Sequence, residues 1–352
     1  MWSTTNSRVS VLAFCLIGVT AAFAKSDAWE PFEAVEPHMG ALFRIKLYAH
    51  NQAEAESAFH AAFARIAELD DILSDYKEES ELKRFCRAPA HQPVIVSTDL
   101  FRNLDVAQQV ALASDGAFDI TLGPVIRLWR DARHSGHLPE RSALDAAATR
   151  CGFRKLHLDH KRHSAWLDQA GMQLDLGGIA KGYAADEALL TLSKHGITSA
   201  LVAASGDLAM SNAPPGKSGW RIGVDSVDVA SAPFTKILLL HNAAVSTSGG
   251  TEQHVDTGGK SYSHIIDPKT DIGLTNPITV TIVARHGLEA DPLATAVSVM
   301  GVEKGMRLIE RHQGTAALIV TGKGSRMVSH TSSRFQKLTD KESAPEAGKK
   351  ER

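Results

Sequence analysis

Residues 174–186 bring an acid, two adjacent glycines and a lysine close together in the sequence. The alternating residues 172–175 predict a short strand that ends at Asp175, and the alanine-rich segment that follows predicts a helix with Lys181 at its start. Between them, Gly177 and Gly178 allow a tight turn that leaves backbone groups uncovered. This combination suits an anionic ligand that carries phosphate, with a metal ion nearby. Taken alone, it equally fits a plain strand-to-helix connection with surface charges.

A second candidate is Asp291, which is followed by Pro292 and, four residues later, by Thr295. The Asp-Pro pair predicts a helix that begins here, with Asp291 as N-cap and proline in the first turn. Residues at i and i+4 share one face of a helix. A carboxylate and a hydroxyl placed in this way can supply two hard oxygen ligands to Mg²⁺, with water and phosphate completing the octahedron.

Other polar residues have a stronger structural interpretation when each is taken alone. Phe118 and Asp119 lie in a loop bracketed by glycines and a proline, where a buried ring and a capping carboxylate are expected. His264 stands between alternating apolar positions, which favours a histidine at the edge of the core. His157, His160 and His163 fall in a predicted hairpin and are expected to be solvated rather than to bind a metal.

The elements that must position these residues are strands and helices in mixed order. A strand is predicted from Leu42, and helices are predicted over residues 53–73 and 100–114. Residues 125–129 are short and apolar, and 130–142 are expected to form a polar connection. In the remainder of the chain, helices are predicted over residues 185–195 and 301–313. Strands are predicted over residues 199–203, 220–224, 235–240, 243–246, 278–284 and 316–321.

The ends of the chain differ from its middle. Residues 1–24 combine Arg8, an apolar run and an Ala-x-Ala site at Ala22–Ala24, which is typical of a cleavable signal peptide. The expected organisation is a signal peptide (1–24), one domain (25–338) and a charged, disordered tail (339–352). We therefore expect an exported, periplasmic protein. The two cysteines of the mature chain, Cys86 and Cys151, form no disulfide scaffold, and whether they pair is open.

Composition limits the class of protein. The 352 residues are 43% hydrophobic and 22% charged, with a formal net charge of −2, which are ordinary globular values. A nucleic-acid-binding protein normally carries an excess of basic residues, so we do not expect this protein to bind nucleic acid. The chain has neither a Walker motif nor a G-x-G-x-x-G pattern, which argues against ATP or a Rossmann cofactor.

Taken together and in order, the motifs resemble the FAD:protein FMN transferase family (ApbE-like). The resemblance runs from about Met39 to the strand near Val328. It rests on an ordered set of segments: Met39-Gly40, Ser74-Asp75-Tyr76 with Ser80-Glu81-Leu82, Gly116–Asp119 with Gly123-Pro124 and Leu128-Trp129, Asp175–Tyr183, Ser205-Gly206-Asp207, Thr247-Ser248-Gly249, Ser263–Pro268, and Ala290-Asp291 with Thr295.

The resemblance implies the fold, the ligands and the site. It implies a single α+β, T-fold-like domain with mixed or antiparallel sheets flanked by helices. It implies Mg²⁺ held by the Gly178 carbonyl, Asp291 and Thr295, with His264, Lys181 and Asp267 in catalytic roles. His264 matches the proposed catalytic histidine, and either His264 or Asp267 is the hypothetical base. The implied contacts to FAD come from Met39, Tyr76, Ala117, Phe118, Asp119, Asp175, Lys181, His264 and Ile265.

The implied reaction splits the pyrophosphate of the substrate FAD, moves FMN to a threonine hydroxyl of a partner flavoprotein and releases AMP. Typical partners are flavoprotein subunits of electron-transport systems, so contact with a membrane is expected only through the partner. Two other functions stay open, namely an exported FAD-binding flavin carrier and a Mg²⁺-dependent FAD pyrophosphatase. The ligand and catalytic residues favour an enzyme over a carrier, but the sequence does not separate transfer from hydrolysis.

The chain departs from the family pattern at three positions. Ala41 stands where threonine is usual, and Ser205 stands where a second glycine is usual. After Thr270, where glycine is usual, the chain has Asp271-Ile272-Gly273. The third departure is expected to reshape a loop near the active site.

Overall fold

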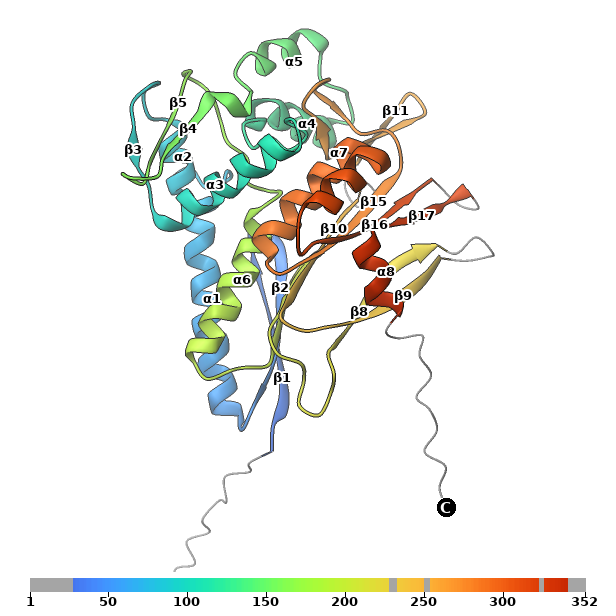
Figure 1. Cartoon of the computed structure of the whole chain (residues 1–352). Helices are drawn as coiled ribbons and strands as arrows, with labels where there is room; N and C mark the ends of the chain where they lie inside the picture. The colour runs from blue at the N-terminus through green and yellow to red at the C-terminus, as the bar shows by residue number, and fades with distance from the viewer. Residues whose placement is uncertain (1–27, 228–232, 250–253, 323–325, 341–352) are drawn as a thin grey trace, which may run out of the picture.

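A central antiparallel sheet organises the chain (Figure 1). The computed structural model describes residues 28–227, 233–249, 254–322 and 326–340. Within these ranges, eight strands pair in the order β1-β2-β6-β7-β10-β15-β16-β17, and every neighbouring pair is antiparallel. The bounds are β1 Glu30–His38, β2 Ala41–Ala49, β6 Ala200–Ala204, β7 Asp207–Met210, β10 Ala243–Gly249, β15 Ile278–Ala284, β16 Ala316–Thr321 and β17 Val328–Thr331. The predicted α+β class is confirmed.

Helices cover one face of this sheet (Figure 1). They are α1 (Gln52–Leu73), α6 (Ala180–Lys194) and α7 (Gly287–Arg311), and α1 and α7 both pack against α6. Alternate residues of a strand point to opposite faces. On β16, Ala317 and Ile319 accordingly join the helices in the main core. The remaining helices are α2 Glu81–Cys86, α3 Thr98–Ala113, α4 Gly123–Ser135, α5 Arg141–Ala148 and α8 Ser333–Asp340, with a 3-10 turn at Phe153–Lys155.

The opposite face packs on a hairpin and the last helix. Leu318 of β16, the neighbour of Ala317 and Ile319, faces this second core together with Phe335 of α8. The hairpin is β8 (Trp220–Val227) with β9 (Pro233–Leu240). The other small strands are β3 Val94–Ile95, β4 Leu156–Asp159, β5 Ser164–Leu167, β11 His254–Thr257, β12 Lys260–Ser263, β13 Ile266–Asp267 and β14 Ile272–Gly273. The predicted hairpin with the three histidines is confirmed as β4–β5.

Two sequence-based element predictions near the site are wrong. Residues 130–142 do not form a polar connection, because α4 and α5 both run through this range. These helices bury only narrow stripes, such as Val125, Trp129 and Ala132 on α4, among many charged residues. Residues 172–175 form a single bridge, Gln173 to Leu122, and not a strand.

The start of α7 is also different from the prediction. The helix begins at Gly287, and Pro292 lies inside it, so Asp291 is not its N-cap. The carboxylate of Asp186 on α6 accepts hydrogen bonds of 2.9 Å from the N–H groups of Gly287 and Leu288. A cap supplied by a distant helix therefore takes the role that the local Asp-Pro pair suggests.

The two ends lie largely outside the described residues. The predicted signal peptide (1–24) falls there entirely, and so do residues 341–352 of the predicted tail. The first two residues of that tail, 339 and 340, belong to α8. Among the described residues, no helix is long and apolar enough to cross a membrane. Both Cys86 and Cys151 are free thiols, so the open question of their pairing is answered.

Candidate active site

The site begins where α6 crosses α7 at very short distance. A Cβ atom on Gly182 would lie 2.2 Å from the Gly287 carbonyl oxygen, so only glycine permits this approach. The crossing brings Asp291 under the start of α6, where its carboxylate accepts a hydrogen bond of 3.3 Å from the Gly182 N–H. Asp291 is 5% exposed. Asp291, the predicted metal ligand on α7, is thus buried against the segment that carries Lys181 and Gly182.

Gly178 meets Thr295 and Phe118 on the same side of this crossing. A Cβ atom built on Gly178 would lie 3.1 Å from the Thr295 hydroxyl oxygen and 3.3 Å from the Phe118 ring. Thr295 follows Asp291 by one turn of α7, as the i, i+4 spacing predicts. Three hard oxygen donors, namely the Asp291 carboxylate, the Thr295 hydroxyl and the Gly178 carbonyl, therefore come from two adjoining segments. Oxygen donors of this kind suit Mg²⁺.

Lys181 lies in the first turn of α6, as predicted, and is held by two oxygen atoms. Its ammonium donates to the Gly177 carbonyl at 2.9 Å and lies 3.4 Å from a carboxylate oxygen of Asp207. Asp207, which starts β7 and is 5% exposed, also accepts a hydrogen bond of 2.5 Å from the Ser246 hydroxyl. Burial opposes the lysine's charge, but Asp291 and Asp207 outweigh this and raise the pKa of Lys181. The lysine is therefore a fixed, permanent cation.

The charges around Lys181 support the fit of a divalent cation. Burial, and then the negative charge of Asp207, raise the pKa of Asp291 to about 8, against the opposing effects of Lys181 and the Gly182 N–H. One lysine therefore faces two buried carboxylates, and a bound cation would relieve the excess negative charge. Within the described ranges, no group of three or more His, Cys, Asp or Glu side chains is placed to hold a metal ion. A site here would depend on the mixed donor set of one carboxylate, one hydroxyl and one carbonyl.

A second cluster of charges adjoins the first through Asp175. Its carboxylate accepts hydrogen bonds from the Gly177 N–H at 2.8 Å and from Arg130 at 2.6 Å. The same guanidinium donates to Asp75 and lies 4.2 Å from the centre of the Tyr76 ring. Two predicted FAD contacts, Tyr76 and Asp175, are therefore joined by one arginine. The sequence reasoning missed Arg130, although it directly follows the quoted Leu128-Trp129 pair.

The loop of Ala117, Phe118 and Asp119 is held by its own carboxylate. One oxygen of Asp119 accepts from the Thr121 N–H at 2.8 Å and the Thr121 hydroxyl at 2.6 Å, and the other accepts from the Phe153 N–H at 2.9 Å. Burial raises the pKa of Asp119 despite these bonds. The capping role that the sequence favoured is confirmed, and the ring of Phe118 is buried. The predicted FAD contacts of this loop stay predictions.

His264, Ile265 and Asp267 lie on the segment between β12 and β14. His264 is half-buried, Ile265 is buried, and Asp267 accepts a hydrogen bond of 2.9 Å from the Lys269 N–H. The loop that follows is fixed to α4, because the Trp129 ring N–H donates to the Asp271 carbonyl at 2.9 Å. The catalytic roles of His264 and Asp267 stay predictions.

At two of the departures from the family pattern, the structure gives a physical reason why glycine would be favoured. Asp271 has a φ of 62° and Ser205 a φ of 56°, and both angles lie in the left-handed region that favours glycine. The positions where the family usually has glycine are therefore ones where glycine would avoid strain. Aspartate and serine adopt this left-handed conformation at some cost in energy.

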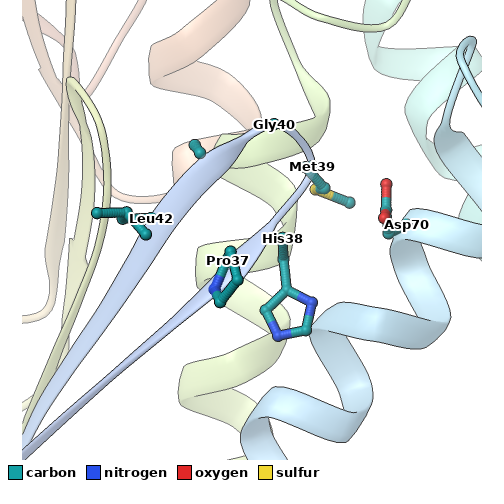
Figure 2. A pocket seen from close by; sticks show the side chains of 7 residues that line it. Pro37, His38, Met39, Gly40, Leu42 and Asp70 are labelled. Carbon is teal, nitrogen blue, oxygen red and sulfur yellow. The ribbon is translucent and has the colours of Figure 1, made fainter.

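Met39 lies in a hollow at the tip of the β1–β2 hairpin (Figure 2). The hollow has a volume of about 390 Å³, and its lining includes Met39, Gly40 and Asp70 of α1. Figure 2 shows the Met39 side chain directed toward Asp70, with Leu42 on the opposite side of the hairpin. Met39 therefore presents a sulfur atom to an open depression, which is compatible with its predicted contact to FAD.

Comparison with known proteins agrees with this architecture. The family model described as the ApbE family matches residues 39–319. An FAD:protein FMN transferase of Treponema pallidum is 32% identical over 328 residues, covering 89% of this chain and 90% of its own length. One from Klebsiella pneumoniae is 30% identical over 284 residues, covering 80% and 87% respectively.

Solved structures agree as well. The Pseudomonas stutzeri flavinyl transferase ApbE superimposes with a TM-score of 0.77 at 30% identity, covering 88% of this chain and 97% of its own. The flavin transferase ApbE from Vibrio cholerae superimposes with a TM-score of 0.79 at 27% identity, covering 88% and 100% respectively. A family model that spans most of the chain, together with these relatives, shows that the chain belongs to the ApbE family.

Proposed function

We propose that this protein is an exported, Mg²⁺-dependent FAD:protein FMN transferase. The observation that carries the proposal is the meeting of Asp291, Thr295 and Gly178 beside the fixed cation Lys181. The names of its relatives support the same activity. In this proposal the enzyme binds FAD as substrate and transfers its FMN half to a partner protein.

The residues around the α6–α7 crossing would have two electrostatic roles, which are to hold Mg²⁺ and to stabilise negative charge on phosphate. Asp291, Thr295 and the Gly178 carbonyl would hold Mg²⁺, which neutralises charge on phosphate oxygens when it is bound. Lys181 is held by Gly177 and Asp207 and would stabilise the negative charge that develops during attack at phosphorus. Asp207 keeps the ammonium in place, and the Ser246 hydroxyl in turn orients Asp207.

The proposed reaction is a substitution at the FMN phosphorus. The threonine hydroxyl oxygen of the partner forms a bond to this phosphorus, and the bond from phosphorus to the bridging oxygen breaks. AMP leaves with the bridging oxygen, and the threonine proton passes to a base. His264 and Asp267 are the candidates for that base. One carboxylate oxygen of Asp267 accepts a hydrogen bond from the Lys269 N–H.

The proposed partner is a flavoprotein subunit or domain of an electron-transport system that carries the target threonine. Residues 1–24 have the pattern of a cleavable signal peptide, so we place enzyme and partner on the exported side, in the periplasm. Association with a membrane would then arise through the partner.

The experiment incubates the mature protein with FAD, Mg²⁺ and an acceptor-domain fragment that carries a threonine. AMP release and the intact mass of the fragment are measured together. An FMN-sized mass gain that matches the AMP released would support the transferase. If AMP and free FMN form without a mass gain for any of several acceptors, the protein is an FAD pyrophosphatase and not a transferase. Tight FAD binding without either product would replace it by a flavin carrier.

A further inference from the structure

Arg130 contacts two residues of the proposed FAD site, Tyr76 and Asp175, and it also contacts Asp75. One terminal nitrogen donates to Asp75, and the other donates to Asp175 at 2.6 Å. The face of the same guanidinium lies 4.2 Å from the centre of the Tyr76 ring. Tyr76 itself is 71% exposed, so the ring has little other packing to hold it. A single side chain therefore fixes two carboxylates and one exposed aromatic ring.

The helix that carries Arg130 is anchored at both sides of the site. At its start, Leu122 bridges to Gln173, two residues before Asp175. In its second turn, Trp129 donates a hydrogen bond to the Asp271 carbonyl in the loop that follows His264. Because α4 is fixed to both segments, the position of the Arg130 guanidinium relative to Asp175 is set by the fold.

The geometry requires arginine and not just a positive charge. A guanidinium is planar, so its edge can donate to two carboxylates while its face stacks on an aromatic ring. A lysine ammonium is a compact charge that can approach one carboxylate closely but cannot stack in this way. Without the cation, Asp75 and Asp175 would repel each other, since the charge of Asp175 adds to burial in raising the pKa of Asp75.

We propose that Arg130 is a positioning residue for FAD, which holds Tyr76 and Asp175 in the arrangement that receives the dinucleotide. This inference rests on the proposed function, because it assumes that FAD binds at these two residues. A preorganised site avoids the entropy cost of ordering its side chains when the ligand binds. Loss of Arg130 should therefore weaken FAD binding more than it slows the chemical step.

The test compares Arg130→Met and Arg130→Lys with the wild-type protein, each without residues 1–24, in a buffer that contains Mg²⁺. The FAD dissociation constant is measured by flavin fluorescence, and KM for FAD, kcat and the melting temperature are measured alongside. The matched control is Arg133→Met on the same helix, one turn further on, where the arginine's charge also acts on Tyr76, Arg130 and Asp175. The control removes a positive charge from the same helix but leaves the contacts of Arg130 with Asp75, Asp175 and Tyr76 in place.

We expect Arg130→Met to raise the dissociation constant and KM for FAD about tenfold or more, and Arg130→Lys to recover only part of the loss. Arg133→Met should change both by less than about threefold. The inference is overturned if Arg130→Lys binds FAD as tightly as wild type, or if Arg130→Met lowers only the melting temperature. Wild-type protein that does not bind FAD would instead refute the proposed function.

A double-mutant cycle with Tyr76→Leu tests the contact even if Arg130→Met folds poorly. Tyr76 is mostly exposed, so its replacement should leave the fold intact. If Arg130 acts through the ring, Arg130→Lys should cost less FAD affinity in the Tyr76→Leu protein than in wild type. Equal losses in both backgrounds would show that the arginine does not position Tyr76.

Discussion

Two regions of the site each place one cation between two carboxylates, but they do so differently. On α4, Arg130 donates directly to both Asp75 and Asp175. At the α6–α7 crossing, Lys181 lies 3.4 Å from Asp207 and reaches Asp291 through longer-range attraction. Asp291 accepts a hydrogen bond of 3.3 Å from the Gly182 N–H and has its pKa raised to about 8, first by burial and then by Asp207.

The difference indicates which region is built for a second cation. Around Arg130 both carboxylates are held by direct hydrogen bonds to the guanidinium, although burial and Asp175 still raise the pKa of Asp75, so this region can serve to position a ligand. Around Lys181 a buried carboxylate retains a high cost of ionisation, which a divalent cation would remove. Under the proposed function, the arginine region would serve mainly to bind FAD, and the lysine region would serve mainly to cleave it.

The largest expected effect is the loss of activity on removing the charge of Asp291. Asp291→Asn keeps the size of the side chain but removes the predicted anionic ligand of Mg²⁺. We expect the rate of AMP release to fall about a thousandfold or more, which corresponds to about 4 kcal/mol in the barrier. Far-UV circular dichroism should be unchanged, and FAD should still bind. A variant with wild-type turnover would remove Asp291 from the metal site.

The second largest expected effect is the loss of stability when a methyl group is added at the contact between α6 and α7. Gly182→Ala places a methyl group 2.2 Å from the Gly287 carbonyl, so the two helices must separate. We expect a loss of about 3 kcal/mol in the free energy of unfolding, measured with urea, although alanine is the better helix former. Gly249→Ala is the control, because its nearest neighbour is the Thr279 side chain at 3.2 Å. Equal effects of the two changes would contradict the close crossing.

The pH dependence of stability should report on the buried carboxylate of Asp291. Asp291 has a pKa near 8 in the folded protein and near 3.9 in the unfolded chain, so the folded state holds its proton more tightly. Its contribution to stability is fully present below about pH 4 and is lost as the pH rises through about 8. In EDTA, urea unfolding should show this decline, by up to about 1.4 kcal/mol per pH unit.

Two controls accompany the pH experiment. Mg²⁺ should restore the stability that is lost near pH 8, because it favours the ionised carboxylate. In Asp291→Asn the decline should be smaller, since this group no longer titrates. An identical decline in the Asn variant would mean that another group causes it.

The smallest expected effects concern the left-handed residues, one in each region. Ser205 leads into Asp207 beside Lys181, and Asp271 is held by Trp129 of α4. Ser205→Gly and Asp271→Gly should each raise the free energy of unfolding by about 1 kcal/mol, because glycine avoids the cost of a positive φ. Ser205→Ala is the control and should give no gain. Destabilised glycine variants would show that the hydroxyl or carboxylate outweighs the strain.

Much of the frame could be predicted because its patterns are local. The strand β15 matches its predicted range of 278–284, and α1 begins at Gln52, one residue before its predicted start. Asn51 explains that start, since its side chain accepts a hydrogen bond of 3.0 Å from the Glu54 N–H. The lysine at the start of α6 and the shared face of Asp291 and Thr295 could be predicted for the same reason.

The remainder depends on contacts between distant residues. The start of α7 is set by Asp186 on another helix, so the local Asp-Pro signal pointed to a wrong position. Arg130 looked like part of a polar connection, because α4 buries only a narrow stripe of apolar residues. Its partners Asp75 and Asp175 lie far away in the sequence, and only the fold brings them to the same guanidinium.

The most direct test of the proposed Mg²⁺-dependent transfer measures product formation by wild type and Asp291→Asn side by side, with FAD, the acceptor fragment and a Mg²⁺ titration. AMP release and the mass of the fragment are followed in the same samples. We expect wild type to add one FMN-sized mass per AMP released as Mg²⁺ rises, and Asp291→Asn to bind FAD but form neither product. FMN transfer by Asp291→Asn at the wild-type rate, or by wild type at full rate in EDTA, would contradict a metal-dependent transfer that requires Asp291.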